Sequence, residues 1–227
     1  MKLLAVETAT AACSAALFID GEIAERFEVA PKEHTRLILP MIDSLMAEAG
    51  LKPHDLDALA FGCGPGSFTG VRIATGVIHG IAFGADLPVV PVSTLAAIAQ
   101  DFFDKKAGSV AFTAMDARMG EIFWGVYLRN NRGYAELTGI ESVTAAEMIE
   151  FPDLTGVGVG SGWGVYRQQL MTRLAGRVNH SEIDYLPRAR AVARLGAYGF
   201  EQGLAVDVEH AMPVYLRDKV AKKESER

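Results

Sequence analysis

The sequence predicts an α/β protein made of two similar halves, each a small sheet with helices packed against it. Three observations support this prediction. Short apolar runs typical of strands alternate with longer amphipathic stretches typical of helices. The element order over residues 1–106, βββαβαβα, returns approximately over residues 107–217. A glycine-rich turn from strand to helix occupies the same place in each half, at 62–70 and at 160–164. Two such halves place a cleft between two sheets.

Turn and capping signals separate the elements of the first half. Asp20-Gly21 joins two strand patterns as a hairpin, and Gly50 closes the first helix as a C-cap. Ser93 or Thr94 caps the last helix of this half. The predicted elements are strands at 3–6, 14–19 and 22–29, a helix at 34–49, a strand at 59–61, a helix at 70–84, a strand at 88–92 and a helix at 94–103.

The second half follows a similar order, with a turn at 130–133 between two of its strands. The charged residues 218–227 are predicted to form a disordered tail. The predicted elements are strands at 110–115, 121–128 and 134–137, a short helix at 145–150, a strand at 157–160, a helix at 165–174, an edge strand at 179–183 and a final helix at 188–202.

Composition and charge restrict the classes of function. A net charge of −6 argues against a chain that grips a nucleic-acid backbone by itself. Two cysteines, Cys13 and Cys63, are too few for a disulfide framework, and we interpret each as a small buried residue. Glu7 interrupts the apolar N-terminus, and the apolar run at 73–85 is too short to span a bilayer. We therefore expect a cytoplasmic protein without membrane contact.

The glycine-rich turn at 62–70 is a candidate ligand site. Free N–H groups at the start of the following helix favour an anion, and a phosphate is one candidate occupant. The residues placed to contact it are Gly64, Gly66, Ser67 and Thr69. A tight turn without any ligand explains the same residues equally well, because glycine permits positive φ and a close approach. The spacing matches neither a Walker A loop nor G-x-G-x-x-G.

Two helices carry more apolar or small surface than packing on one sheet requires. The helix at 34–49 has two adjacent apolar stripes, and the second stripe is either a broad core face or a partner surface. The helix at 70–84 has a smooth glycine stripe, which indicates a close neighbour that is either the protein's own sheet or a second subunit. The stripes are Leu37, Met41 and Leu45; Ile38, Ile42 and Met46; and Gly76, Gly80 and Gly84.

The common catalytic patterns are missing. The five histidines include no pair at helical metal-ligand spacing, so we expect no metal site. Neither Ser67 nor Ser161 lies in a G-x-S-x-G nucleophile elbow. Asp116 and Arg118 follow a predicted strand; they either position a carboxylate as a base or form a local ion pair, and we favour the ion pair.

Four segments, in this order along the chain, resemble the bacterial TsaB (YeaZ) family. They are Glu7-Thr8-Ala9-Thr10, the specific run Gly64-Pro65-Gly66-Ser67-Phe68-Thr69-Gly70-Val71-Arg72, Asp116-Ala117-Arg118 and Pro213-Val214-Tyr215-Leu216-Arg217. The resemblance covers nearly the whole chain. It implies the actin-like ATPase fold, also called the sugar kinase, heat-shock and actin fold, which agrees with the duplicated pattern.

The resemblance also implies a role in making N6-threonylcarbamoyladenosine in tRNA. In this family the chain pairs with the paralogous catalytic subunit TsaD, and the ATPase TsaE joins the pair. TsaD transfers the acyl group from threonylcarbamoyl-AMP to the adenosine N6. The family implies homodimers when the partner is absent, with no direct tRNA contact by this chain. The helices at about 34–49 and 70–84 would dock on TsaD.

Departures from the catalytic paralogue imply a required component of the transferase complex that is not catalytic alone. The paralogue carries a metal-binding H-x-x-x-H where this chain has Thr94 and Ile98, and actin-like kinases carry an Asp where it has Glu7. We therefore expect no catalytic residue and no metal, with ATP or ADP as a candidate ligand in the complex. The residues assigned to the partner interface are Leu37, Met41, Leu45, Arg72, Gly76 and Gly80.

An alternative of a different class is a free-standing nucleotide-binding kinase or ATPase. The turns at 62–70 and 160–164 support it, because both could bind phosphate. A weak nucleotide sensor within the complex is a third interpretation. Binding of ATP with Mg²⁺ to the isolated chain separates these readings.

Overall fold

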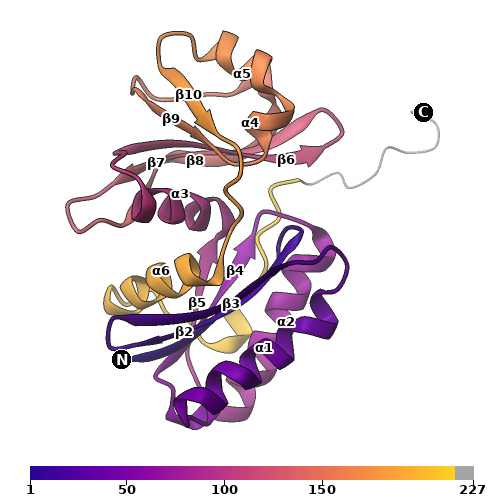
Figure 1. Ribbon diagram of the computed structural model, residues 1–227, viewed down its shortest axis with the longest axis vertical. Coiled ribbons are helices and arrows are strands. Elements are labelled where there is room, and N and C mark those ends of the chain that lie inside the picture. Colours follow the sequence, from indigo (N-terminus) through magenta and orange to yellow (C-terminus); the bar gives the residue numbers. More distant parts are fainter. Residues whose placement is uncertain (218–227) are drawn as a thin grey trace.

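The structure is a computed structural model that describes residues 1–217; the predicted tail at 218–227 lies outside the described residues. Each half of the chain forms a five-stranded sheet, and helices lie between and outside the two sheets (Figure 1).

The elements agree in kind with most of the predicted ones. In the first half they are β1 (Lys2–Glu7), β2 (Ala12–Ile19), β3 (Glu22–Val29), α1 (His34–Ala49), the 3₁₀ helix η1 (Pro53–Asp55), β4 (Ala58–Gly64), α2 (Phe68–Ala85), β5 (Val89–Ser93) and α3 (Thr94–Lys105). In the second half they are β6 (Val110–Arg118), β7 (Glu121–Arg129), β8 (Ala135–Ala145), η2 (Ala146–Met148), β9 (Gly156–Val159), α4 (Gly162–Val165), α5 (Arg167–Arg173), β10 (Val178–Glu182), α6 (Ala189–Glu201) and η3 (Val208–His210).

The two sheets have the same strand order. The first is β3-β2-β1-β4-β5, and the second, read in the matching direction, is β8-β7-β6-β9-β10. In each sheet the first three strands of the half pair antiparallel, and the last two are added in parallel. This repeated topology confirms the predicted duplication and the actin-like α/β fold. It also confirms β10 as an edge strand.

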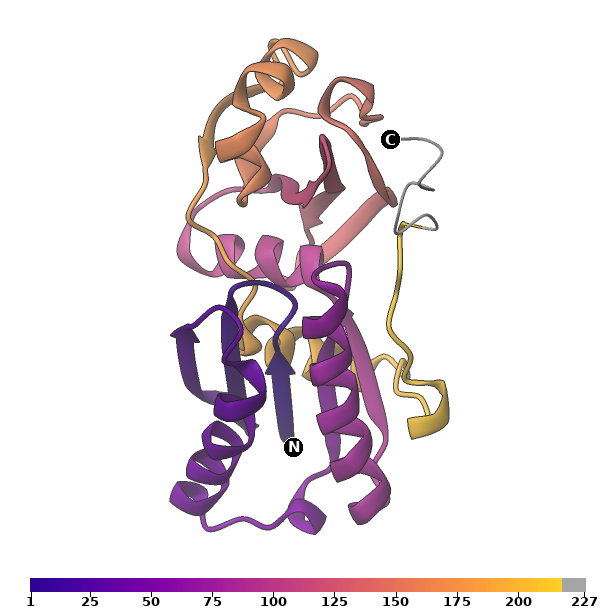
Figure 2. The same cartoon turned by 90° about the vertical axis from the view of Figure 1, so that its right-hand side faces the viewer.

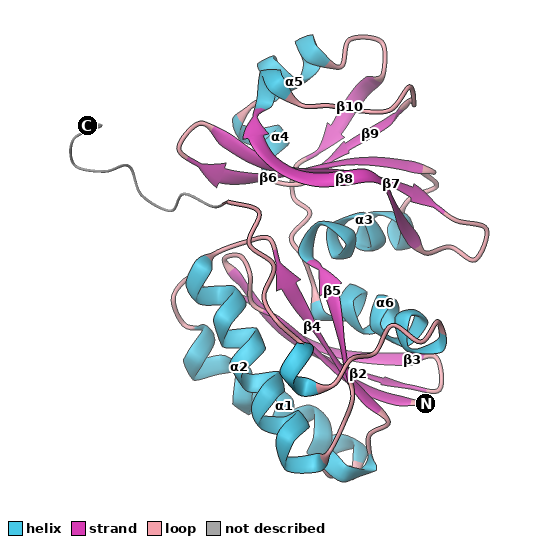
Figure 3. Ribbon diagram, turned by 180° about the vertical axis from the view of Figure 1, so that it is seen from behind, coloured by secondary structure: helices cyan, strands magenta, loops and turns pink. Residues whose placement is uncertain are grey.

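Helices α3 and α6 are exchanged between the halves. The last helix of the chain, α6, packs on β1, β2 and β4 of the first sheet, whereas α3 packs on β6, β7 and β8 of the second. The two helices contact each other and form the layer between the sheets (Figures 1 and 3). Helices α1 and α2 lie side by side on the other face of the first sheet, as Figure 2 shows.

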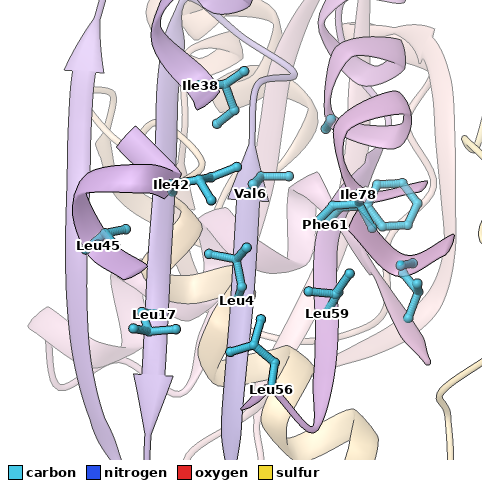
Figure 4. Packing of buried hydrophobic residues seen from close by; sticks show 14 of the residues in the cluster. Leu4, Val6, Leu17, Ile38, Ile42, Leu45, Leu56, Leu59, Phe61 and Ile78 are labelled. Atoms are coloured by element: carbon cyan, nitrogen blue, oxygen red, sulfur yellow. The ribbon is translucent and has the colours of Figure 1, made fainter. Parts of the chain in front are cut away.

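The core between α1, α2 and the first sheet uses both apolar stripes of α1. Figure 4 shows Ile38, Ile42 and Leu45 packed with strand residues such as Leu4 and Leu17. Leu45 belongs to the stripe of Leu37, Met41 and Leu45, yet only 1 % of it is exposed, and the other two residues pack partly buried against the same core. This stripe is therefore mainly a broad core face.

Three predicted elements of the second half have the wrong extent. The predicted helix at 145–150 is only η2, because β8 continues to the residue before it. The predicted helix at 165–174 is two short helices that meet at Tyr166, where φ −114° and ψ 28° interrupt the helix. Strand β8 extends far beyond the predicted 134–137, because the chain stays extended on both sides of Gly139, which has positive φ.

Helix α2 is also apolar and long enough, by composition and length alone, to be a candidate membrane span among residues 1–217. One of its faces packs on β4 and β1 and against α1. Core helices of soluble proteins meet the same criteria, so this finding assigns no membrane role.

Candidate functional site

The glycine-rich turn between β4 and α2 is packed against the protein's own main chain. A Cβ atom at Gly66 would lie 2.6 Å from the carbonyl oxygen of Ala9, and one at Gly70 would lie 2.1 Å from the carbonyl oxygen of Thr8. A side chain cannot be accommodated at such distances without moving backbone. The turn that follows β1 thus requires both glycines without any ligand.

The C-terminal segment closes the turn from the other side. Gly64 has φ +108°, and a Cβ there would lie 2.6 Å from the carbonyl oxygen of Val214, whose N–H donates to the Cys63 carbonyl at 2.7 Å. The second half has a similar local geometry, because Gly160 has φ +104° and a Cβ there would lie 2.7 Å from the carbonyl oxygen of Ala114. The predicted second glycine-rich turn is thereby confirmed.

Ser67 caps α2. Its hydroxyl accepts a hydrogen bond from the Gly70 N–H at 3.4 Å, and Thr69 beside it is exposed. Main-chain packing already accounts for the glycines, so a phosphate contact by Gly64, Gly66, Ser67 and Thr69 stays a prediction.

A buried carboxyl group lies beneath this turn. Glu7 is 1 % exposed, and its Oε1 accepts the Ala9 N–H at 2.6 Å. Its Oε2 and the Thr94 hydroxyl are both buried with no hydrogen-bond partner among residues 1–217. Oε2 lies over Gly62, where a Cβ would be 1.8 Å away. Burial raises the pKa of Glu7 to about 7, against the N–H groups of Ala9 and Thr8, which lower it.

A second, half-buried acid joins the two halves, and the sequence analysis missed it. The Glu141 carboxylate on β8 accepts hydrogen bonds from the Ser93 hydroxyl and from the Tyr127 hydroxyl. Ser93 also caps α3, because its hydroxyl accepts the Leu95 N–H at 3.1 Å. Burial raises the pKa of Glu141, and the two hydroxyls oppose this shift. The carboxylate thus occupies the N-terminal end of α3, where an anion is favoured.

A bulge in β8 places Glu141 there. The register between β7 and β8 shifts so that Trp124 pairs with Ser142 but Val126 pairs with Thr138. Gly139, with φ +83°, lies within the extra residues. The bulge turns Glu141 inward, while the adjacent Ile140 is 78 % exposed. A glycine inside a strand pattern was the available sequence signal.

Asp116 and Arg118 form the local ion pair that we favoured. The Arg118 guanidinium lies 3.0 Å from the Asp116 carboxylate, and the Arg118 N–H donates to the same carboxylate at 2.9 Å. Arg118 and Met119 both have positive φ in the tight turn before β7.

The outer face of α2 is open. A Cβ at Gly76, Gly80 or Gly84 would meet no atom of residues 1–217 within 4 Å, so the interpretation that the protein's own sheet lies against this stripe is wrong. Phe83 on the same helix is 84 % exposed, and Arg72 is exposed one turn before Gly76. The glycines are therefore free for a close approach by another molecule.

Helix α1 contributes less to this surface than the sequence predicted. Leu45 was assigned to the partner interface, but it is 1 % exposed in the core, so this assignment is corrected. Leu37 and Met41 are partly buried against the same core, and their interface role stays a prediction. Leu39, which the stripe analysis omitted, is 56 % exposed.

Metal-binding and thiol chemistry find little support within residues 1–217. No group of three or more His, Cys, Asp or Glu side chains there is placed to hold a metal ion. Thr94 and Ile98, which the resemblance placed opposite the paralogue's histidines, are buried on α3. Burial raises the pKa of Cys13 to about 11 and that of Cys63 to about 12, so both thiols stay protonated as small buried residues.

Comparison with known proteins agrees with the fold and with the sequence motifs. The family model described as TsaD: tRNA N6-adenosine threonylcarbamoyltransferase matches residues 27–225. The structure of YeaZ from Pseudomonas aeruginosa is similar with a TM-score of 0.88 and 40% sequence identity, covering 95% of this chain and 99% of that one.

Two curated relatives carry the name tRNA threonylcarbamoyladenosine biosynthesis protein TsaB. The protein from Escherichia coli K12 is 41% identical, over 97% of this chain and 96% of its own length. The protein from Haemophilus influenzae is 37% identical, over 97% of this chain and 95% of its own length. With the shared motifs and the duplicated fold, this similarity establishes that the chain belongs to the TsaB (YeaZ) family.

Proposed function

We propose that this chain is a non-catalytic partner of a TsaD subunit and activates transfer of the threonylcarbamoyl group from threonylcarbamoyl-AMP to adenosine N6 in tRNA. The names of its relatives support the pathway. The open face of α2 carries the proposal of a partner role.

That face has the chemistry of a docking surface. The three glycines at 76, 80 and 84 leave the α2 backbone uncovered, although each glycine costs a helix about 1 kcal/mol relative to alanine. Exposed Phe83 and Leu39 add apolar side chains on the two neighbouring helices α1 and α2. Glycine on the outer side of a helix does not stabilise this chain by itself. We therefore infer that these glycines stabilise an assembly in which a partner approaches the α2 backbone closely.

The closed glycine-rich turn supports a role without chemistry of its own. The space beside Gly66 and Gly70 is filled by the main chain of Ala9 and Thr8. The N-terminal end of α3 is neutralised by the chain's own Glu141. Catalysis of acyl transfer would then belong to the partner.

The decisive experiment is threonylcarbamoyl transfer to unmodified tRNA with purified TsaD, TsaE and threonylcarbamoyl-AMP, with and without this chain. We expect turnover only when the chain is present, and none from the chain alone. Unchanged turnover without it would overturn the proposal. Tight binding of ATP with Mg²⁺ to the isolated chain would instead favour the free-standing nucleotide-binding enzyme.

Pairing is tested separately by filling the open face. Gly76→Phe adds a side chain where no atom lies within 4 Å, so the fold should be kept while pairing with TsaD is lost. Gln168→Phe, on an exposed position of α5, is the matched control. Size-exclusion chromatography with light scattering measures pairing. An intact heterodimer with Gly76→Phe would show that the open face of α2 lies outside the interface with TsaD.

The remaining parts of the proposal concern the cell and the assembly. We propose a cytoplasmic protein that forms homodimers through the same helices when TsaD is absent and that TsaE joins once TsaD is bound. ATP or ADP is proposed only as a ligand of the complex, and tRNA contact is assigned to the partner.

A further inference from the structure

Arg72 lies over one aromatic ring and near a second at the start of α2. Its guanidinium carbon lies 3.2 Å from the centre of the Phe68 ring and 5.2 Å from the centre of the Tyr215 ring. The two rings are 5.9 Å apart. Contact with the Phe68 ring, together with the Tyr215 ring beside it, restricts the guanidinium and reduces the side-chain entropy lost on binding.

The polar edge of this guanidinium is unused. Among the described residues, every other arginine side chain makes at least one hydrogen bond or ion pair. The Arg72 side chain makes none with any residue in 1–217, and it is exposed. A guanidinium presents five N–H donors in a planar fork that matches a carboxylate or a phosphate.

The surroundings favour a carboxylate over a polyanion. Arg217, two residues after Tyr215, pairs with Glu121. Its guanidinium also donates to the carbonyl of Arg118, whose own side chain pairs with Asp116. Among residues 1–217, Arg72 alone has a guanidinium without a hydrogen bond or ion pair, and it lies against rings that are 52 % exposed at Phe68 and 46 % exposed at Tyr215. Phosphate backbones attract several cations, whereas the dominant contacts of protein interfaces are enriched in arginine and tyrosine.

We propose that Arg72 is a preorganised anchor for one Asp or Glu side chain of the partner protein, bound through both carboxylate oxygens, while Phe68 and Tyr215 pack on apolar surface around it. The inference rests on the proposed pairing function and adds the chemistry that the partner must present. Arg72 lies one helical turn from the open stripe that begins at Gly76, so the anchor continues that docking surface.

The test measures affinity between the full-length chain and the TsaD subunit of the same organism by calorimetry at two salt concentrations. The variants are Arg72→Lys, Arg72→Ala and Arg72→Glu, with Arg167→Lys on α5 as the matched control. Because Arg72 is exposed, we expect each variant to keep the wild-type melting temperature. Lysine keeps the charge but loses the fork and the stacking, so we expect affinity to fall about ten-fold with Arg72→Lys and about a hundred-fold with Arg72→Glu.

Single Asp and Glu residues of the partner are then changed to Arg, which reverses their charge. We expect one of these partner variants to restore binding to the Arg72→Glu variant. Wild-type affinity in both Arg72→Lys and Arg72→Glu would overturn the anchor while leaving the pairing proposal intact. If the wild-type chain does not pair at all, the proposed function fails first. If Arg72→Glu abolishes binding of tRNA but leaves pairing unchanged, the site recognises nucleic acid and the proposal is wrong.

Discussion

Replacement of Glu7 by glutamine tests whether a buried acid destabilises the first half at neutral pH. The side chain has the same shape in both residues, but Gln cannot be ionised. Its amide nitrogen adds a donor near Oε2 of the native residue, where the buried Thr94 hydroxyl also lacks a partner among residues 1–217. We therefore expect Glu7→Gln to stabilise the protein above neutral pH.

The size of the effect follows from the pKa. Burial raises the pKa of Glu7 from an ordinary value of 4.5 to about 7 in the folded chain. Between these values the folded state binds more protons than the unfolded state, so the free energy of unfolding falls as pH rises from about 4.5 to about 7. At about 1.4 kcal/mol per pH unit, the loss approaches about 3 kcal/mol above pH 8. Glutamine removes this loss.

Urea unfolding of both proteins at pH 5 and at pH 8, at one protein concentration, measures the effect. The difference in free energy of unfolding between Glu7→Gln and wild type should be about 2–3 kcal/mol larger at pH 8 than at pH 5. Glu28→Gln removes one exposed carboxylate and serves as the control for net charge. An equal difference at both pH values would refute the reasoning, because it would show that Glu7 is ionised in the folded protein throughout this range.

Three further predictions concern packing. Gly70→Ala should destabilise the protein by more than about 2 kcal/mol in thermal unfolding, because its Cβ would overlap the turn after β1. Gly76→Ala should instead stabilise the isolated chain by about 0.5–1 kcal/mol. A stabilising Gly70→Ala with a destabilising Gly76→Ala would contradict the assignment of Gly70 to the packed turn and Gly76 to the open face. Leu45→Ala should cost about 2–5 kcal/mol, whereas Leu39→Ala should have little effect on unfolding; similar losses would place both side chains in the core. Ser93→Ala should lower the free energy of unfolding by at least about 1 kcal/mol and weaken contact between the halves, because it removes the cap of α3 and the hydrogen bond to Glu141. Faster amide hydrogen exchange in α3 would detect this change.

The fold could be predicted from the sequence because its elements are local. The Asp20-Gly21 hairpin has positive φ at both residues, and Gly50 is a left-handed C-cap, as their residue types indicate. The exchange of α3 and α6 was not visible in the pattern, because an amphipathic helix does not record which sheet it covers. The Gly139 bulge escaped because the strand was predicted to end at 137, before the glycine, whereas β8 continues to Ala145.

The candidate site was harder to predict, because its key contacts join distant parts of the chain. Glycine at 66 and 70 signals a close approach, but the sequence does not say whether a ligand or the protein's own main chain approaches. The stripe at Gly76 was read as packing on the sheet or on a partner, and only the three-dimensional arrangement leaves it open. Arg72 was assigned to the interface without its most specific feature, because Tyr215 lies far along the sequence.

The C-terminal segment connects the closed turn with the open surface. Val214 pairs with the main chain at Cys63, and the Tyr215 ring contacts the Phe68 ring at a tilt of 37°. Two residues later Arg217 pairs with Glu121 in the second half. One short stretch thus fills the space beside the glycine-rich turn, supports the ring stack around Arg72 and joins both halves. The same contacts that leave the turn without room for side chains hold the start of α2 in a fixed orientation. These contacts favour the role that we propose for the duplicated fold, a support for α2 as a docking helix, over a cleft that opens and closes around a ligand.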